Sequence, residues 1–180
     1  MRYFKKMAGQ RLYLSPVNPD DAETYTKWLN DYGVSGNLGN YNQLISLTSE
    51  RKSLEKMATD GQHYAIVLTD GDLLIGNISF VEIDPKNRRA TAGLFIGEPE
   101  NRGKGYGAEA FRLLLDYGFK TLGLHNIGLY VHADNERAIA CYKKVGFREY
   151  GRGRESFFKN GKYIDIVCMD ILDSEFYAEK

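Results

Sequence analysis

The sequence contains few of the residues that mark secreted, fibrous or membrane proteins. Only two cysteines, Cys141 and Cys168, occur among 180 residues, and both lie in apolar periodic segments. We therefore predict buried free thiols rather than a disulfide or a metal pair. No apolar run approaches the roughly 20 residues that a membrane-spanning helix needs. Because residues 1–14 are basic and lack the apolar stretch of a signal peptide, we expect a cytoplasmic protein without a membrane partner.

An excess of charge of one sign is also absent. The 24 Lys and Arg residues balance 24 Asp and Glu residues, so no overall field draws the chain toward nucleic acid. The three histidines, His63, His125 and His132, are too dispersed for a metal-binding spacing such as H-x-x-x-H, and we expect no metal. Hydrophobic residues make up 43% of the chain and charged residues 27%, as in an ordinary globular protein. We expect a single domain over residues 1–180.

Hydrophobic periodicity and turn residues predict an α+β fold with a mainly antiparallel sheet. The elements that we expect, in order, are a strand over 11–16, a helix over 18–31 with Asp20 as N-cap, a Gly- and Asn-rich loop over 32–42, a helix over 48–61 capped by Thr48 or Ser49 and stopped by Gly61, strands over 63–69, 73–84 and 88–98, a helix over 106–123, a strand over 126–133, a helix over 134–147 capped by Asn135 or Asp134, and two final strands over 147–158 and 162–172. Asn160-Gly161 between the last two strands indicates a type I′ hairpin turn.

A glycine-rich stretch, ENRGKGYGAEA, precedes the helix expected from residue 106. The first N–H groups of a helix lack intrahelical partners and carry partial positive charge, so such a loop favours phosphate. Arg102 and Lys104 add positive charge, although a solvated basic turn has the same composition. A Walker loop is disfavoured because no Ser or Thr follows Lys104. A relaxed dinucleotide fingerprint runs from Gly105 to Ala110, but hairpins precede it rather than the first strand of a βαβ series.

Two motifs resemble those of the GNAT N-acetyltransferases. Arg102-x-x-Gly105-x-Gly107 resembles the pyrophosphate loop Q/R-x-x-G-x-G/A, and NERAIACYKKVGF, from Asn135 to Phe147, is similar to the second signature of that superfamily. The resemblance runs from about residue 11 to residue 172 and is greatest to ribosomal-protein N-terminal acetyltransferases and spermidine acetyltransferases. It implies the GNAT fold, a mixed and mainly antiparallel sheet flanked by helices. It also implies an enzyme that transfers an acetyl group from acetyl-CoA to a primary amine.

The same resemblance assigns residues to the cofactor. The backbone of Phe95, Ile96 and Gly97 would pair with the pantetheine arm of acetyl-CoA. Asn135 would hydrogen-bond an amide of that arm, although as a single residue it is equally an N-cap. The backbone N–H groups that would bind the pyrophosphate belong to Arg102, Gly103, Lys104, Gly105, Tyr106, Gly107 and Ala108.

The chemistry needs a neutral amine, a polarised thioester and a proton for the departing thiolate. By resemblance, Tyr142 is the acid that supplies this proton, although its place on an apolar helix stripe is also that of a core residue. Glu82 and Glu98 are the nearest candidates for a base, and each is equally explained as a solvated charge at a strand edge. Direct attack with loss of the proton to water stays open.

The resemblance leaves the acceptor open between a protein N-terminus, a polyamine such as spermidine and another small amine. A catalytically silent sensor that binds acyl-CoA is the alternative from another class. Dimers are common among relatives. In relatives, the segments that contain the following aromatic residues border the acceptor groove: Tyr32, Tyr41, Phe157, Phe158 and Tyr163. The same residues could equally be core residues or hairpin pairs. The basic stretch GRGRES lacks an accompanying aromatic face for base stacking, so no nucleic-acid partner is expected.

Overall fold

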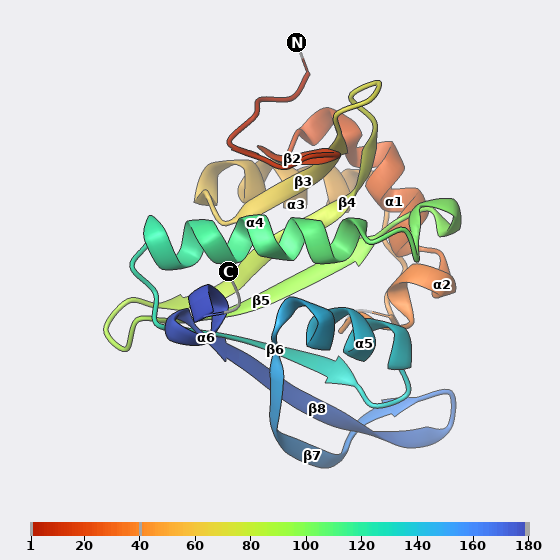
Figure 1. Ribbon diagram of the computed structural model, residues 1–180. Helices are drawn as coiled ribbons and strands as arrows, with labels where there is room; N and C mark the ends of the chain where they lie inside the picture. The colour runs from red at the N-terminus through yellow and green to blue at the C-terminus, as the bar shows by residue number, and fades with distance from the viewer. Residues whose placement is uncertain (1, 40, 179–180) are drawn as a thin grey trace. The chain divides into compact units, whose positions relative to one another are not determined.

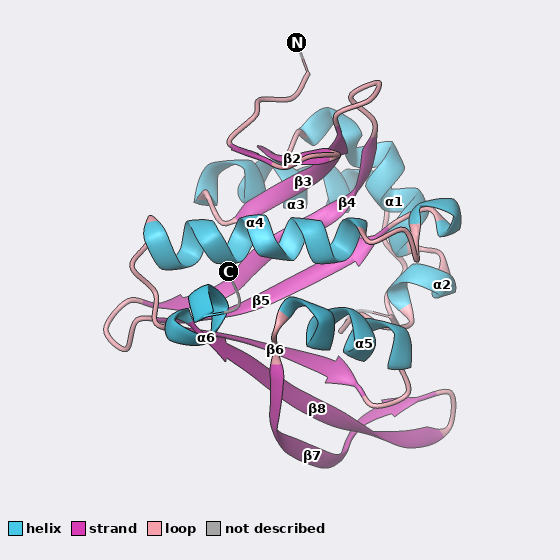
Figure 2. Ribbon diagram, viewed as in Figure 1, coloured by secondary structure: helices cyan, strands magenta, loops and turns pink. Residues whose placement is uncertain are grey.

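The computed structural model describes residues 2–39 and 41–178 (Figure 1). The chain forms two compact units, one from residues 1–79 and 94–113 and the other from residues 80–93 and 114–180. Three elements contribute residues to both units: strands β4 (Leu74–Asp84) and β5 (Arg89–Ile96) and helix α4 (Tyr106–Lys120). Each unit combines helices with sheet, which confirms the predicted α+β class (Figure 2).

The first unit contains an antiparallel sheet with strand order β1-β2-β3-β4. Its other elements are β1 (Met7–Ala8), β2 (Leu12–Pro16), β3 (His63–Leu68), α1 (Ala22–Leu29), α2 (Tyr32–Ser35), α3 (Leu47–Asp60) and the 3-10 turns η1 (Pro19–Asp21) and η2 (Pro99–Asn101). Helices α1 and α3 share a core with β2 and β3, in which the buried side chains include Tyr13, Tyr25, Trp28, Leu54 and Val67. This core fixes α1 beside the strands.

Two side-chain caps of the first unit lie two or three residues before the predicted positions. Asn18, rather than Asp20, opens the first helical segment, because its side chain accepts a hydrogen bond from the N–H of Asp20 at 3.0 Å. Ser46 caps α3, and Ser49 completes a capping box as the third helical residue. The predictions of Asp20, Thr48 and Ser49 as caps were therefore wrong. The helix stop at Gly61 is confirmed, with a left-handed φ of 72°.

The predicted loop over 32–42 contains a short helix. Asp31 accepts a hydrogen bond from the N–H of Gly33 at 2.8 Å and so caps α2, which the composition of this segment did not indicate. Asn40 lies outside the described residues. The side chain of Asn30, just before this segment, donates a hydrogen bond to the carbonyl of Ile45 and accepts one from its N–H. These two bonds hold the chain on either side of the segment together before α3 begins.

The second unit contains strands in the order β5-β6-β8-β7. Its remaining elements are β6 (Asn126–His132), β7 (Arg148–Lys159), β8 (Lys162–Leu172), α5 (Glu136–Val145) and α6 (Asp173–Ala178), of which α6 was not predicted. β6, β8 and β7 pair antiparallel, whereas β5 and β6 run parallel, so the sheet is mixed and mainly antiparallel as predicted. Asn160 and Gly161 have φ values of 52° and 76°, which confirms the type I′ turn between β7 and β8.

Parallel pairing between β5 and β6 covers only a short stretch. Arg89, Ala90 and Thr91 lie opposite residues 126–128, whereas β5 continues to Ile96 and β6 to His132. Beyond Gly128, β6 is paired only with β8 in the described part of the chain. The edge of β6 that faces away from β8 therefore has unpaired backbone groups there, which a ligand or a chain segment can meet.

Composition led to expectations about the cysteines, membrane-spanning helices and metal sites. Cys141 and Cys168 are half-buried, whereas buried thiols were predicted. No helix within residues 2–39 and 41–178 is long and apolar enough to cross a membrane. In the same residues, no group of three or more His, Cys, Asp or Glu side chains is arranged to hold a metal ion.

Candidate active site

The glycine-rich loop before α4 leaves a run of backbone donors open. Gly103 and Gly105 have φ values of 73° and 84°, a conformation that side chains rarely adopt, and helix α4 starts at Tyr106. Among the described residues, nothing accepts a hydrogen bond from the N–H groups of residues 103–108. Gly103, Lys104 and Gly105 are exposed, so these donors can reach a ligand. Adjacent N–H groups at a helix start form an anion site.

Arg11, at the start of β2, holds this loop in place. Its backbone N–H and its Nε donate to the two carboxylate oxygens of Glu109, each at 2.8 Å, and its Nη1 donates to the carbonyl of Lys104 at 2.9 Å. The guanidinium also lies 4.9 Å from the centre of the Tyr106 ring. Burial acts to raise the pKa of Glu109, but the hydrogen bonds from Arg11 outweigh it and hold that pKa below its usual value. Nothing in the sequence indicated this role of Arg11, because its partners lie more than ninety residues away.

Arg102 acts mainly through its side chain. Its Nε donates to the carbonyl of Ile96 at 3.2 Å, its Nη2 donates to the carbonyl of Gly97, and its Nη1 donates to the carbonyl of Gly33 at 3.1 Å. Its backbone N–H, which was predicted to bind pyrophosphate, donates instead to the carbonyl of Pro99 at 3.0 Å. The free donors of the loop therefore begin at Gly103.

The predicted pantetheine strand, Phe95 to Gly97, lies at the end of β5 in the first unit. The ring of Phe95 meets Tyr25 and Trp28 edge-on, with ring centres 6.1 Å apart in each case. The N–H of Gly97 donates to the carbonyl of Ile75 at 2.9 Å, which ties the strand end to β4. This part of the predicted site is thus firmly packed from the β4 side.

Asn135 and Tyr142 lie on α5 in the second unit. The side-chain oxygen of Asn135 accepts a hydrogen bond from the N–H of Ala138 at 3.2 Å, which confirms the N-cap, and its amide nitrogen meets no partner in the described residues. Tyr142 is only 9% exposed, and its ring contacts Phe147 edge-on at 6.1 Å. Burial raises the pKa of Tyr142 well above the usual value of a phenol, so its hydroxyl stays protonated at neutral pH.

The two candidate bases have different surroundings. Glu82 is exposed on β4, and no ion pair or hydrogen bond links it to the described residues. Glu98 accepts hydrogen bonds from Lys27 at 2.5 Å and from the indole Nε1 of Trp28 at 3.0 Å. Lys27, and then Trp28, lower the pKa of Glu98. Since a lower pKa means a weaker base, these contacts make Glu98 a poor candidate for the base.

The aromatic residues of the β7–β8 hairpin form pairs within the second unit. Phe158 and Tyr163 lie opposite each other with ring centres 5.1 Å apart, and both are exposed. Phe157 stacks on His132 with ring centres 4.0 Å apart. Phe158 and Tyr163 are thus a hairpin pair, whereas Phe157 contacts a residue of β6, the strand on the other side of β8.

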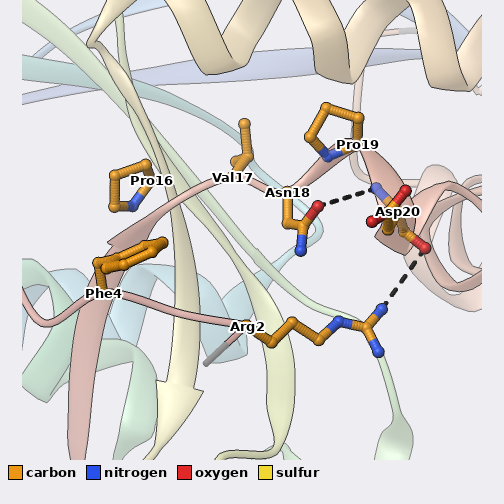
Figure 3. A pocket seen from close by; sticks show the side chains of 7 residues that line it. All are labelled: Arg2, Phe4, Pro16, Val17, Asn18, Pro19 and Asp20. Carbon is orange, nitrogen blue, oxygen red and sulfur yellow. Dashed lines mark hydrogen bonds between the residues drawn. The ribbon is translucent and has the colours of Figure 1, made fainter.

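A separate hollow of about 530 Å³ lies in the first unit, before α1 (Figure 3). In it, Arg2 donates to the backbone carbonyl of Asp20, and Asn18 accepts the hydrogen bond that caps η1. The residues that line it are Arg2, Phe4, Pro16, Val17, Asn18, Pro19 and Asp20. No residue that the sequence assigned to the cofactor or to catalysis is among them.

The fold and the glycine-rich loop are those of the GNAT family. Residues 11–148 match the family described as an acetyltransferase (GNAT) domain, and the chain belongs to that family. Spermidine N(1)-acetyltransferase of Escherichia coli (strain K12) is 39% identical over 114 residues, which are 63% of this chain and 60% of that protein. The protein named "Putative ribosomal N-acetyltransferase YdaF" of Bacillus subtilis (strain 168) is 35% identical over 114 residues, 63% of this chain and 61% of its own length.

These alignments span about three fifths of the length of both relatives. A solved structure gives wider coverage. The spermidine N-acetyltransferase of Vibrio cholerae, in complex with CoA and spermine, has a TM-score of 0.82 and 29% identity, and the match covers 94% of this chain and 99% of that one. The predicted GNAT fold is confirmed.

Proposed function

We propose that the protein is an N-acetyltransferase that moves an acetyl group from acetyl-CoA to a primary amine. The observation that carries this proposal is the run of N–H groups over residues 103–108 that meet no acceptor among the described residues, in a loop whose Gly103, Lys104 and Gly105 are exposed. A pyrophosphate offers several anionic oxygens to such a run. The membership of the GNAT family favours CoA as the carrier of that pyrophosphate.

The proposed cofactor contacts come from the glycine-rich loop, the end of β5 and the N-cap of α5. Residues 103–108 bind the pyrophosphate through their N–H groups. The backbone of Phe95 to Gly97 pairs with the pantetheine arm as an added strand would. The amide nitrogen of Asn135 donates to a carbonyl of that arm while its oxygen keeps the N-cap of α5.

The proposed chemistry is direct attack by the amine. The amine nitrogen forms a bond to the thioester carbonyl carbon, the carbon–sulfur bond breaks, and the sulfur leaves with the electron pair. The amine loses its proton to water or to Glu82. Tyr142, whose raised pKa keeps it protonated at neutral pH, donates its hydroxyl hydrogen to the departing sulfur. The tyrosinate then regains a proton from solvent, which receives the proton that the amine loses. The products are an N-acetylated amine and CoA.

A peptide N-terminus is the first candidate acceptor. In relatives the segment over residues 32–42 borders the acceptor groove, and here it contains no Asp or Glu, the residues that would pair with a polycation. Spermidine is the second candidate, favoured by the 39% identity to an enzyme named for it. The two acceptors differ in charge, so the salt dependence of the rate distinguishes them. If carboxylates of the protein bind a polyamine, the rate of its acetylation falls as the salt concentration rises.

The release of CoA thiol with a panel of amines tests the proposal. The panel contains spermidine, spermine, aminoglycosides and peptides with varied N-termini, and we expect thiol release with at least one of them. A sensor would gain thermal stability with acetyl-CoA and yet release no thiol with any amine. Stabilisation by NADH but not by acetyl-CoA would contradict the cofactor assignment itself.

A further inference from the structure

The indole ring of Trp28 lies directly against the backbone of Gly97, at the end of the proposed pantetheine strand. A Cβ atom added at Gly97 would lie 2.6 Å from the indole Nε1 and still closer to Cδ2 and Cε2, inside the van der Waals limit. Trp28 is 2% exposed and is held by the core around α1, which includes Tyr25. Because the ring has no room to move, it sets how far the backbone of Gly97 can approach α1.

Glu98 fixes the orientation of that ring. One carboxylate oxygen, Oε1, accepts the N–H of Trp28 at 3.0 Å and the ammonium of Lys27 at 2.5 Å. Hydrogen bonds to an ionised carboxylate are stronger than those between neutral groups. Both donors come from the last turn of α1, so Glu98 ties the residue after Gly97 to the same helix that supplies the ring.

Arg102 holds the strand end through its carbonyls. Its guanidinium donates to the carbonyls of Ile96 and Gly97 and reaches the carbonyl of Gly33 in α2. A planar guanidinium with several donors in fixed directions suits this arrangement better than a lysine does. The backbone over residues 96–98 is therefore held by the ring, by the carboxylate and by the guanidinium together.

We propose that Trp28, Glu98 and Arg102 are positioning residues, which hold the backbone of residues 95–97 in the geometry that binds the pantetheine arm. In this assignment Glu98 acts through Trp28 and Lys27 and does not take the proton of the amine. The inference rests on the proposed function, since it takes residues 95–97 as a cofactor-binding strand. It predicts that changes in these residues act on acetyl-CoA rather than on the amine.

Glu98→Gln separates positioning from base catalysis. The amide keeps an oxygen for the N–H of Trp28 but loses the charge, so we expect the KM for acetyl-CoA to rise about threefold to tenfold. The KM for the amine and the shape of the pH profile of kcat stay as in the wild type. Glu100→Gln is the matched control, because Glu100 is an exposed carboxylate two residues away, and its KM values are expected to stay at those of the wild type. A fall in kcat of about 100-fold or more in Glu98→Gln, with loss of the acidic limb of the pH profile, would overturn the proposal, since that is the signature of a general base.

Gly97→Ala tests the contact with the ring. The added methyl group pushes the strand away from α1, and we expect the KM for acetyl-CoA to rise about tenfold or more. The double variant Gly97→Ala/Trp28→Leu removes the clash, and its KM for acetyl-CoA should be at least threefold lower than that of Gly97→Ala. Gly123→Ala is the control, because a Cβ there meets nothing within 4 Å and Gly123 lies in the connection between α4 and β6.

Thermal denaturation shows which variants fold. If Gly97→Ala does not fold, Trp28→Phe replaces it, because phenylalanine is smaller than tryptophan and lacks the indole N–H. An unchanged KM for acetyl-CoA in folded Gly97→Ala or Trp28→Phe would contradict the inference. If the wild type itself neither binds acetyl-CoA nor releases CoA thiol, the proposed function fails instead. The two failures are therefore distinguishable.

Discussion

Replacing Gly105 by alanine tests whether the loop before α4 grips the cofactor. Gly105 has a φ of 84°, and a Cβ atom there would lie 3.3 Å from Nη2 of Arg11, the flexible end of a long side chain. The steric part of the change is therefore small. The main cost is the left-handed backbone, which is about 1–2 kcal/mol for a residue with a Cβ.

This cost appears as lost stability, as lost affinity, or as both. If the backbone of Gly105→Ala keeps its shape, the fold loses about 1 kcal/mol, or about 2–4 °C in Tm for a chain of this size. If the loop relaxes toward negative φ, the N–H groups of residues 103–108 turn away and binding must restore them. Since 1.4 kcal/mol is a factor of ten in Kd, we expect the Kd of acetyl-CoA to rise about fivefold to tenfold.

Gly123→Ala supplies the matched control. Gly123 also has a left-handed φ, 66°, and a Cβ there meets nothing within 4 Å, but it lies in the connection between α4 and β6. We expect a similar loss of Tm and an unchanged Kd, with calorimetry for binding and thermal denaturation for stability. The reasoning would be refuted if Gly105→Ala bound acetyl-CoA as tightly as Gly123→Ala and the wild type.

Two further predictions concern single side chains of the proposed site. Tyr142→Phe should lower kcat by about 100-fold or more while the Kd of acetyl-CoA stays constant. Because burial raises the pKa of Tyr142, the kcat of the wild type should show no loss from this group below about pH 10. A wild-type rate in the folded Tyr142→Phe variant would exclude Tyr142 as the acid. Glu109→Gln should lower the free energy of unfolding by about 0.5–1 kcal/mol at pH 7. Because Arg11 holds the pKa of Glu109 below that of the unfolded chain, this difference is present above about pH 4.3 and fades as the pH falls through the lowered pKa. Denaturant unfolding at pH 7 and pH 3.5 measures it, and a difference that persists at pH 3.5 argues against the ion pair.

Local features of the fold were predictable because neighbouring residues decide them. Asn160-Gly161 can form the type I′ turn without partners from elsewhere, and Gly61 ends α3 because glycine tolerates a left-handed φ. The caps that were predicted wrongly are also local, but there several polar residues compete. Asn18 precedes Pro19, which favours the first helical position, and Ser46 and Ser49 both belong to one capping box, so composition alone did not rank them.

Some features of the candidate site were predictable from neighbouring residues, and others were not. The motifs placed the loop over residues 102–108 and the helix that contains Asn135 and Tyr142, because their spacing is written in consecutive residues. Which loop donors are free was not visible in the sequence: the N–H of Arg102 is taken by Pro99, and that pairing depends on the η2 turn. The base strength of Glu98 was equally hidden, since it depends on α1.

The sequence by itself determined that a glycine-rich loop opens a helix, which residues flank it and which chemistry such a loop favours. Only the tertiary structure decided that Arg11 fastens the loop, that Trp28 lies on Gly97 and that Arg102 reaches back to Gly33. The reason is physical: backbone conformation and turn propensity act between neighbours in the chain. Hydrogen-bond partners, close contacts and pKa values depend on neighbours in space, and here those neighbours lie up to ninety-eight residues apart.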